Sequence, residues 1–364
     1  MTADLGRPTI VSLVGARPQF VKVAPVHHEL QMRGLRHHIV HSGQHYDNRL
    51  SKSFFDDLQI PVPSVNLEAG SGGHAEQTAR IIERLDNALD QLRPDIVIVY
   101  GDTNTTLAGA VVVSKRSEYL VHVEAGLRSF NRRMPEEMNR IVADHLSHLL
   151  LVPTTAAMKL LEAEGLASRS RQVGDVMVDV LRNTTKMVSE HQPEMPTGWT
   201  NSDDFVFATL HRAENTDDPA RLRQLIGRLG AMHHDVRLAA HPRLTARMSE
   251  FNISATGGLS LWQPLSYPQT VHATAQSVAV ITDSGGLQKE AVLLERPCIT
   301  ARHETEWFET VEAGWNLLDP DLNAPLAEWI RRPRSPLSEG IFGDGHAARN
   351  IVDEILDGWG HHRD

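Results

Sequence analysis

The chain has 364 residues, 41% hydrophobic and 23% charged, and its 36 basic and 46 acidic residues give a formal net charge of -10. This length exceeds what one compact core usually serves and suits two domains. The acidic balance argues against a protein that holds nucleic acid or an anionic membrane, although a few convergent Arg and Lys side chains can still form a local anion site.

Cysteine content and the N-terminal sequence bear on the compartment. Cys298 is the single cysteine, so no internal disulfide is possible and a reducing compartment fits best. The segment Met1–Pro8 lacks the basic and apolar pattern of a signal peptide. No apolar run approaches the ~20 residues that span a bilayer. We therefore expect a cytoplasmic protein with no membrane partner.

In the first half, short apolar runs alternate with amphipathic stretches, the pattern of a parallel sheet covered by helices. Strands are expected at Ile10–Val14, His38–His41, Asp95–Tyr100, Leu120–Val123, Leu149–Val152 and Arg171–Val173. Helices are expected at Phe20–Arg33, Asn48–Leu58, Ala75–Leu92, Thr105–Ser114, Pro135–His145, Thr154–Glu164 and Val176–Ser189. The polar, Pro-containing stretch His191–Asp204 is typical of a linker.

The second half repeats this alternation. Strands are expected at Phe205–Leu210, Val236–Ala240, Leu259–Trp262, Ser277–Ile281 and Cys298–Thr300, and helices at Pro219–Met232, Gln269–Ala275, Leu287–Leu294 and Glu306–Glu312. The sequence therefore predicts an α/β protein of two Rossmann-like, doubly wound domains, residues 1–190 and 205–344, facing each other across a cleft. Residues 345–364 show helical apolar spacing and are expected to pack back on the first domain.

The first strand-to-helix turn is Gly15-Ala-Arg-Pro-Gln-Phe-Val-Lys22. Arg17 and Lys22 flank a helix N-terminus, whose free N–H groups and dipole favour an anion. An ordinary turn with a solvated Arg and Lys is an equally good interpretation. The glycine spacing is not that of a dinucleotide fingerprint or a P-loop, so the turn gives no support for NAD or P-loop chemistry.

Ser284-Gly285-Gly286 stands between a buried strand and a helix. Two glycines permit close approach of a phosphate, Ser284 adds a hydroxyl donor, and Glu290 lies one helical turn further on, where it can accept from ribose hydroxyls. The alternative is a serine N-cap with glycines for packing. The glycine pair together with Glu290 favours the ligand site.

Three carboxylates are expected at the edge of the first predicted sheet where its strands end. Asp102 and Glu124 each end a strand, and Glu136 lies in the first turn of a helix. Asp102 has the alternative role of capping the next helix, and an acid in a first helical turn often only complements the helix dipole. Arg140 lies four residues after Glu136 and is expected to hold it in place.

His211 ends a strand in the second half, beside a polar turn. A lone histidine is usually structural, but this one is expected to face the cleft. The histidine spacing elsewhere does not match a metal-binding motif. We therefore expect no metal site.

Together these segments resemble the UDP-N-acetylglucosamine 2-epimerase family. The resemblance is carried in chain order by Gly15–Lys22, Ser42–Asp47, Gly101–Thr103, His122–Arg128, Pro135–Arg140, His211–Asn215, Asp283–Gly286 and Thr305–Trp307. It implies a GT-B type fold, a homodimer and a UDP-sugar substrate, with neither metal nor NAD as cofactor.

The resemblance also implies a mechanism. Anti elimination of UDP gives 2-acetamidoglucal, and re-addition of UDP with protonation at the opposite face gives the manno epimer. Asp102, Glu124 and Glu136 would carry protons. By the same match, phosphate charge would be handled by His211, Arg17, Lys22 and Arg140, phosphate and ribose would be contacted by Ser284, Gly285, Gly286 and Glu290, and Arg302 would join the polar contacts.

Some positions depart from the family pattern. Many members have Glu at the position of Gln19, and an aromatic residue near the uracil where this chain has Thr270. The run Gln44–Asp47 is closer to a branch without substrate activation, which includes epimerases of UDP-2,3-diacetamido-glucuronate. The alternatives are therefore an epimerase of such a modified sugar, a GT-B glycosyltransferase, a hydrolysing epimerase and a regulator that has lost catalysis.

Overall fold

The computed structural model describes residues 6–43, 55, 58–200, 204–336 and 340–363. The chain separates into two compact units: unit 1 comprises Met1–Val180 and Glu339–Asp364, and unit 2 comprises Leu181–Ser338. Helix α7 (Val176–Glu190) begins in unit 1 and ends in unit 2. Among the described residues, no helix has the length and apolar character needed to cross a bilayer.

Unit 1 is built on a seven-stranded parallel sheet in the order β3-β2-β1-β4-β5-β6-β7. Its strands are β1 (Thr9–Val14), β2 (Arg36–His41), β3 (Val65–Asn66), β4 (Ile96–Tyr100), β5 (Tyr119–Val123), β6 (Leu149–Val152) and β7 (Ser170–Gln172). Every residue of β4, β5 and β6 is buried. Strands β4 and β6 are unbroken apolar runs, and β5 departs from one only at His122, because helices cover both faces of the sheet.

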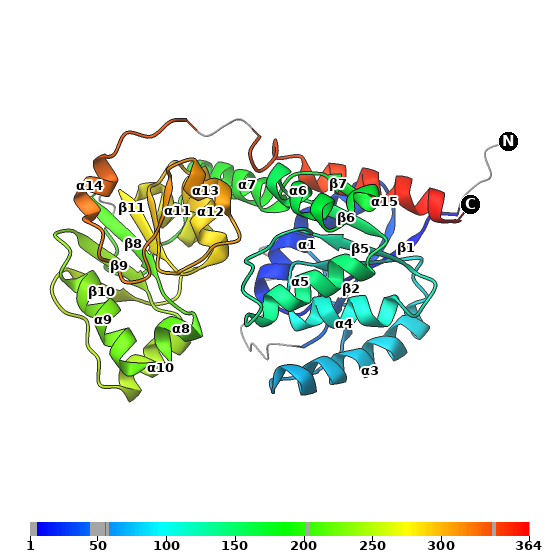
Figure 1. Ribbon diagram of the computed structural model, residues 1–364, viewed down its shortest axis with the longest axis horizontal. Helices are drawn as coiled ribbons and strands as arrows, with labels where there is room; N and C mark the ends of the chain where they lie inside the picture. The colour runs from blue at the N-terminus through cyan, green and yellow to red at the C-terminus, as the bar shows by residue number, and fades with distance from the viewer. Residues whose placement is uncertain (1–5, 44–54, 56–57, 201–203, 337–339, 364) are drawn as a thin grey trace. The chain divides into compact units, whose positions relative to one another are not determined.

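The two faces of this sheet carry different helices (Figure 1). One core contains buried side chains of α1 (Arg17–Met32) and of the C-terminal helix α15 (Ala347–Arg363), including Phe20, Ile351 and Ile355. The opposite core contains α3 (His74–Leu92), α4 (Asn104–Val113) and α5 (Pro135–Leu146). Helix α6 (Thr155–Ala163) and a 3-10 turn at Ala167–Arg169 connect β6 to β7.

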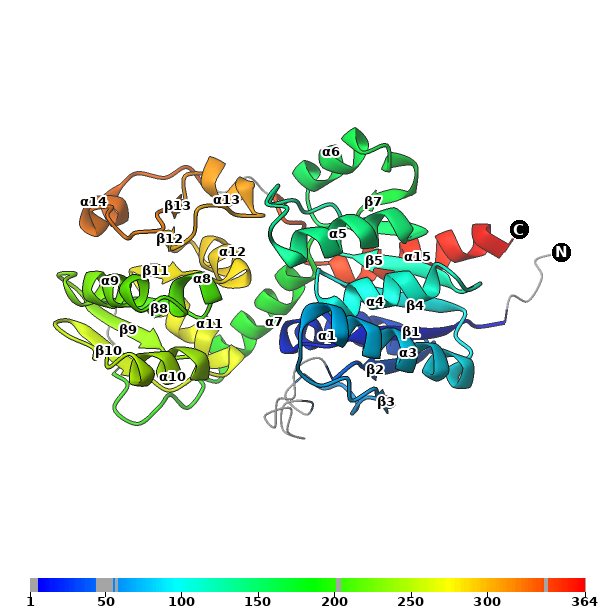
Figure 2. The same cartoon turned by 60° about the horizontal axis from the view of Figure 1, so that its bottom comes forward.

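Unit 2 has a six-stranded parallel sheet in the order β10-β9-β8-β11-β12-β13 (Figure 2). Its strands are β8 (Phe205–Thr209), β9 (Asp235–Ala239), β10 (Leu259–Trp262), β11 (Ala279–Thr282), β12 (Cys298–Thr300) and β13 (Asn316–Leu318). Helices α9 (Pro219–Gly230), α10 (Pro242–Glu250) and α14 (Leu326–Arg331) share one core, and α11 (Tyr267–Gln276) and α12 (Gly285–Leu293) share the other. The short helices α8 (Ala213–Thr216) and α13 (Phe308–Glu312) complete the unit. Two parallel, helix-covered sheets confirm the predicted α/β class.

The sequence did not predict several short elements. Strands β3 and β13 and helices α8, α10 and α14 were missed because they have only two to nine residues. Helix α10 also lacks a Ser, Thr, Asp or Asn cap; the His241 ring accepts from the Arg243 N–H at 3.2 Å instead. The expected helix Asn48–Leu58 falls mostly outside the described residues, and the Gln44–Asp47 run falls entirely outside them.

The strand order fixes where a ligand site is expected. In unit 1 the order reverses between β1 and β4, and in unit 2 it reverses between β8 and β11. Ligands of open parallel sheets bind at the carboxyl ends of strands at such a reversal. The turn after β1, Asp102 after β4, His211 after β8 and Ser284 after β11 all lie at these positions.

A buried polar chain connects side chains of α1, β2, β1 and β4 in unit 1. The Nδ1 atoms of His27 and His37 are 2.8 Å apart, His37 Nε2 is 2.8 Å from Ser12 Oγ, and that hydroxyl is 2.9 Å from the Tyr100 hydroxyl. Burial, with His28 nearby, lowers the pKa of His27 to about 4. Burial, with His27 and His38 nearby, lowers the pKa of His37 to about 3.

This histidine pair predicts a loss of stability in mild acid. The unfolded chain protonates His27 near its usual pKa of 6.5, whereas the folded chain resists protonation down to about 4. Between these values the unfolded state binds more protons, so the free energy of unfolding decreases as pH falls. For His27 alone we expect a loss of about 2 kcal/mol, or about 4–8 °C in melting temperature, between about pH 7.5 and pH 5. His37, whose pKa is also lowered, adds a loss in the same direction.

Differential scanning fluorimetry of wild type, His27→Leu and the control His145→Gln, at an exposed position of unit 1, measures this effect. Leucine removes the buried titrating ring, so its melting temperature should depend less steeply on pH, whereas the control should follow wild type. Equal slopes for all three proteins would show that the pair does not govern acid stability.

Candidate active site

Glu124 and Lys22 form a buried ion pair at the carboxyl edge of the unit 1 sheet. Glu124 follows β5 with a left-handed backbone, φ 70°, and Lys22 lies on α1. Their side chains are only 10% and 15% exposed, respectively. A Cβ on Gly101 would lie 3.2 Å from the Glu124 carboxylate and 3.5 Å from the Lys22 ammonium, so glycine leaves room for the pair.

Three acids act on the Lys22 ammonium. Burial alone would lower the pKa of Lys22, but Glu124, with weaker contributions from Asp102 and Asp175, raises it. The sequence did not predict a role for Asp175. It is buried immediately before α7, where its Oδ1 accepts from the Met177 N–H at 2.8 Å, and a cap residue of this kind gives no sequence signal for a site.

Asp102 is held by an arginine and does not cap the next helix. Its Oδ2 accepts from Arg140 Nη2 at 2.6 Å and from Arg140 Nε at 3.0 Å. The cap of α4 is Thr103, whose hydroxyl accepts from the Thr106 N–H. The capping alternative for Asp102 is therefore wrong, and a third of its side chain, 33%, remains exposed.

The adjacent residues Glu136 and Glu137 differ in environment. Glu137 is 1% exposed, and its carboxylate accepts from the N–H groups of Ser129 and Phe130, at 2.8 and 2.9 Å, and from Arg140 Nη1 at 2.9 Å. Glu136 lies in the first turn of α5, and among the described residues its carboxylate has no hydrogen bond or ion pair. The expectation that Arg140 holds Glu136 is wrong: its described carboxylate partners are Asp102 and Glu137, because the guanidinium reaches back across the first turn of α5.

The turn after β1 is closed by Gln19. Its Oε1 accepts from the N–H groups of Gly15 and Ala16, at 2.7 and 3.2 Å, while its Nε2 donates to the carbonyl of Tyr100 at 2.7 Å. The two N–H groups that precede α1 are therefore occupied within the protein. The backbone of Arg17 begins α1, and its side chain lies outside the described part of the chain.

In unit 2, a buried carboxylate organises the edge at β8 and β11. Asp283 is 0% exposed and accepts from the backbone N–H groups of His211 and Arg212 and from Asn215 Nδ2, all at 3.0–3.1 Å. It also lies 3.1 Å from His211 Nδ1. Burial would raise the pKa of Asp283, but these partners, led by His211, lower it.

This geometry sets the tautomer of His211. A carboxylate facing Nδ1 accepts the proton there, which leaves Nε2 on a side chain that is 40% exposed. The sequence points to His211 but carries no signal for the carboxylate that orients it.

The Ser284 turn has the expected open space. Ser284 caps α12 through the Leu287 N–H. A Cβ on Gly285 or Gly286 would meet nothing closer than 3.8 Å, so neither glycine is required for internal packing. Glu290 is 6% exposed and accepts from the Tyr267 hydroxyl at 3.0 Å, and Arg302 is 2% exposed and pairs with Glu306. These are internal partners that a ligand would share or displace.

Asp283→Asn should destabilise unit 2 because an amide places a donor among N–H groups that need an acceptor. We expect a loss of about 2–4 kcal/mol in the free energy of unfolding. Urea denaturation followed by tryptophan fluorescence measures it. The matched control is Asp235→Asn, whose carboxylate is 45% exposed. Equal midpoints for the two variants would contradict the structural importance of Asp283.

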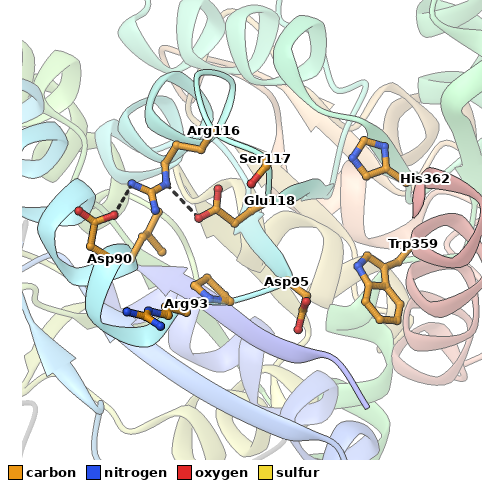
Figure 3. Close-up of a pocket in the computed structure, with 10 residues that line it drawn as sticks. Asp90, Arg93, Asp95, Arg116, Ser117, Glu118, Trp359 and His362 are labelled. Atoms are coloured by element: carbon orange, nitrogen blue, oxygen red, sulfur yellow. Dashed lines mark hydrogen bonds and ion pairs between the residues drawn. The ribbon is translucent and has the colours of Figure 1, made fainter. Parts of the chain in front are cut away.

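A hollow of about 630 Å³ lies at the other edge of the unit 1 sheet (Figure 3). Asp95 and Glu118, which line it, directly precede β4 and β5, whereas Asp102 and Glu124 follow these strands. Three of its charged residues pair with one another, since Arg116 contacts Asp90 and Glu118, each at 2.9 Å. The hollow is thus separate from the candidate site.

Within the described ranges, no group of three His, Cys, Asp or Glu residues is placed to hold a metal ion.

Comparison with solved structures identifies the class of fold. A Methanocaldococcus jannaschii UDP-GlcNAc 2-epimerase, in complex with UDP-GlcNAc and UDP, superposes with a TM-score of 0.89 at 35% identity, covering 96% of this chain and 99% of that one. The Neisseria meningitidis UDP-GlcNAc 2-epimerase bound to UDP-GlcNAc gives a TM-score of 0.85 at 25% identity, covering 96% of this chain and 100% of that one. The fold is of the GT-B type, with two Rossmann-like domains.

Sequence comparison gives the family. The family described as UDP-N-acetylglucosamine 2-epimerase matches residues 28–356. A Methanococcus maripaludis UDP-N-acetylglucosamine 2-epimerase homolog is 41% identical over 95% of this chain and 99% of its own length. The Pseudomonas aeruginosa UDP-2,3-diacetamido-2,3-dideoxy-D-glucuronate 2-epimerase is 38% identical over the same shares of the two chains. This protein belongs to the UDP-N-acetylglucosamine 2-epimerase family and is an isomerase.

Proposed function

We propose that this protein interconverts UDP-N-acetylglucosamine and UDP-N-acetylmannosamine by anti elimination of UDP to 2-acetamidoglucal and re-addition of UDP. The observation that carries the proposal is the carboxylate arrangement of unit 1. Asp102 and Glu124 follow neighbouring strands, each beside a cation, and Glu136 has no partner among the described residues. Family membership makes a UDP-sugar the substrate class.

The chemistry needs such a set of acids. The C2 hydrogen of the sugar is not acidic, since no carbonyl stands beside C2. Departure of UDP from C1 builds positive charge at C1 and makes the C2 hydrogen labile. One carboxylate then takes the proton, and another returns a proton to the opposite face when UDP adds back. The proposal assigns these steps to Asp102, Glu124 and Glu136 in unit 1.

Nucleotide binding is assigned mainly to unit 2. The free space at Gly285 and Gly286, the Ser284 hydroxyl and the N-terminus of α12 suit a diphosphate. His211, oriented by Asp283, presents Nε2 as a phosphate partner, and Glu290 suits the ribose. The remaining proposed contacts come from Arg17, Lys22, Arg140 and Arg302, of which the last three also pair with acids of the protein.

A second candidate substrate is UDP-2,3-diacetamido-2,3-dideoxy-glucuronate. The relative named for that sugar is 38% identical to this chain, and the Methanocaldococcus jannaschii relative named UDP-N-acetylglucosamine 2-epimerase is 37% identical. Sequence identity therefore does not favour one substrate over the other.

Three further properties are part of the proposal. Activity without metal is tested by EDTA treatment, the cytoplasmic location by cell fractionation, and the homodimer by sedimentation analysis.

A proton NMR time course tests the substrate assignment. The enzyme is incubated with each UDP-sugar alone, without acceptor or added metal. We expect the anomeric signal of the manno epimer to grow from UDP-N-acetylglucosamine until equilibrium. Turnover of the diacetamido-glucuronate alone would move the assignment to that sugar, and turnover that requires a sugar acceptor would favour a glycosyltransferase.

A further inference from the structure

The side chain of His122 lies between the two strand ends that carry Asp102 and Glu124. It is fully buried near the end of β5, with Nε2 2.8 Å from the carbonyl oxygen of Gly101 and Nδ1 2.7 Å from Asp144 Oδ1. Both partners are acceptors, so both ring nitrogens have to supply a proton or the carboxyl has to carry one. His122 thus joins β5 to the residue directly before Asp102.

Asp144 links this histidine to the turn after Glu124. Its second oxygen accepts from the Gly126 N–H at 3.2 Å and from Arg128 Nη1 at 2.7 Å. Burial would raise the pKa of Asp144, but His122 and Arg128 lower it, so the group acts as an ionised acceptor. The residues two before and two after Glu124 are therefore both fixed to one buried carboxylate.

The backbone of Glu124 requires this restraint. A non-glycine residue in the left-handed region is strained and persists only where its surroundings hold it. Here Glu124 has φ 70°, and its N–H and that of Ala125 both donate to the carbonyl of Leu151 at 3.1 Å. The hydrogen bonds through Asp144 restrain the turn from its other side.

We propose that His122 and Asp144 are positioning residues for the epimerase reaction: they fix the spacing between the Asp102 and Glu124 carboxylates without touching substrate. The inference rests on the proposed function. Helix α5 carries both Asp144 and Arg140, and Arg140 pairs with Asp102. The positions of Asp102 and Glu124 therefore both depend on this helix. A misplacement of about 1 Å at reacting groups costs roughly 10²-fold in rate.

The test compares His122→Gln, Asp144→Asn and the control Glu164→Gln. Glu164 pairs with the far side of Arg128, at 2.7–2.8 Å, so its loss loosens the same network away from Gly101. We expect kcat per folded enzyme to fall roughly 100-fold in His122→Gln, with KM and UDP affinity nearly unchanged. The loss should be smaller in Asp144→Asn, because the introduced amide can donate to His122 Nδ1 and the bond to Gly101 is kept. The control should lose melting temperature and keep its rate.

The double variant His122→Gln/Asp144→Asn separates positioning from simple destabilisation. The introduced glutamine can donate to the Gly101 carbonyl and accept from the amide of the introduced asparagine, so the link is restored without charge. We expect kcat of the double variant to recover by about tenfold over His122→Gln, a non-additive result. Rates that multiply without recovery, or a His122→Gln enzyme that turns over like the control, would overturn the proposal.

A crystal structure of His122→Gln tests the same idea without activity. We expect Glu124 to leave the left-handed region or the Lys22–Glu124 pair to separate. An unchanged Glu124 turn would overturn the positioning role. A wild-type enzyme inactive on both UDP-sugars would instead refute the proposed function and leave this structural result to stand on its own.

Discussion

Glu124→Gln is expected to lower turnover by about 10²–10⁴-fold, which corresponds to roughly 3–6 kcal/mol in activation free energy. The amide preserves the shape of the side chain but cannot accept and return a proton. UDP affinity should change little, because the proposed phosphate and ribose contacts lie mainly in unit 2. Proton NMR spectra of samples quenched at successive times give the rate, and isothermal titration calorimetry gives the UDP affinity.

The same substitution also removes the charge that compensates Lys22. The buried ammonium loses its nearest carboxylate, so some loss of melting temperature is expected in addition to the loss of rate. The control is Glu29→Gln, which breaks an ion pair with Arg33 at the C-terminal end of helix α1, away from the site. A Glu124→Gln enzyme that melts early but turns over like Glu29→Gln would remove Glu124 from the mechanism.

Glu136→Gln should mainly lower turnover and Glu137→Gln should mainly lower stability, although these residues are neighbours in sequence. Glu136 has no partner within the described part of the chain, so its amide variant should keep the wild-type melting temperature and lose about 10²–10⁴-fold in turnover. Glu137 accepts four hydrogen bonds that hold Ser129, Phe130 and Arg140. Its amide variant should lose about 2–3 kcal/mol of stability.

Thermal denaturation and turnover, measured on both proteins, separate the two roles. Some loss of rate is expected for Glu137→Gln, since Arg140 also contacts Asp102, but it should be smaller than the loss for Glu136→Gln. Full activity of Glu136→Gln combined with a large loss for Glu137→Gln would exchange their assignments.

The sequence predicted the strands that carry the candidate acids because these strands are fully buried. An apolar run such as Ile96–Tyr100, followed by Gly and Asp, is visible without a structure. The structure shows that β4 and β5 are neighbours, which brings together the ends that carry Asp102 and Glu124. Parallel sheets make such adjacency predictable, since consecutive strands usually lie side by side.

The partners of these acids were not predictable in the same way. Arg140 was assigned to Glu136 by helical spacing, but the structure places its guanidinium against Asp102, 38 residues away in sequence. Asp144 and Asp283 resemble ordinary helix and turn residues, and only their buried contacts show what they orient. Side-chain direction and long-range pairing, which local periodicity does not encode, account for these misses.

The central claim is that the C2–H bond is broken and remade, and a solvent-isotope experiment tests it most directly. Wild-type enzyme and UDP-N-acetylglucosamine are incubated in D2O, and the UDP-N-acetylmannosamine formed is analysed by proton NMR and mass spectrometry. Proton exchange between the carboxylates and solvent should place one deuterium at C2, with loss of the C2 proton signal. Product that forms at the normal rate and retains the C2 proton in full would contradict the elimination mechanism and the role of all three acids.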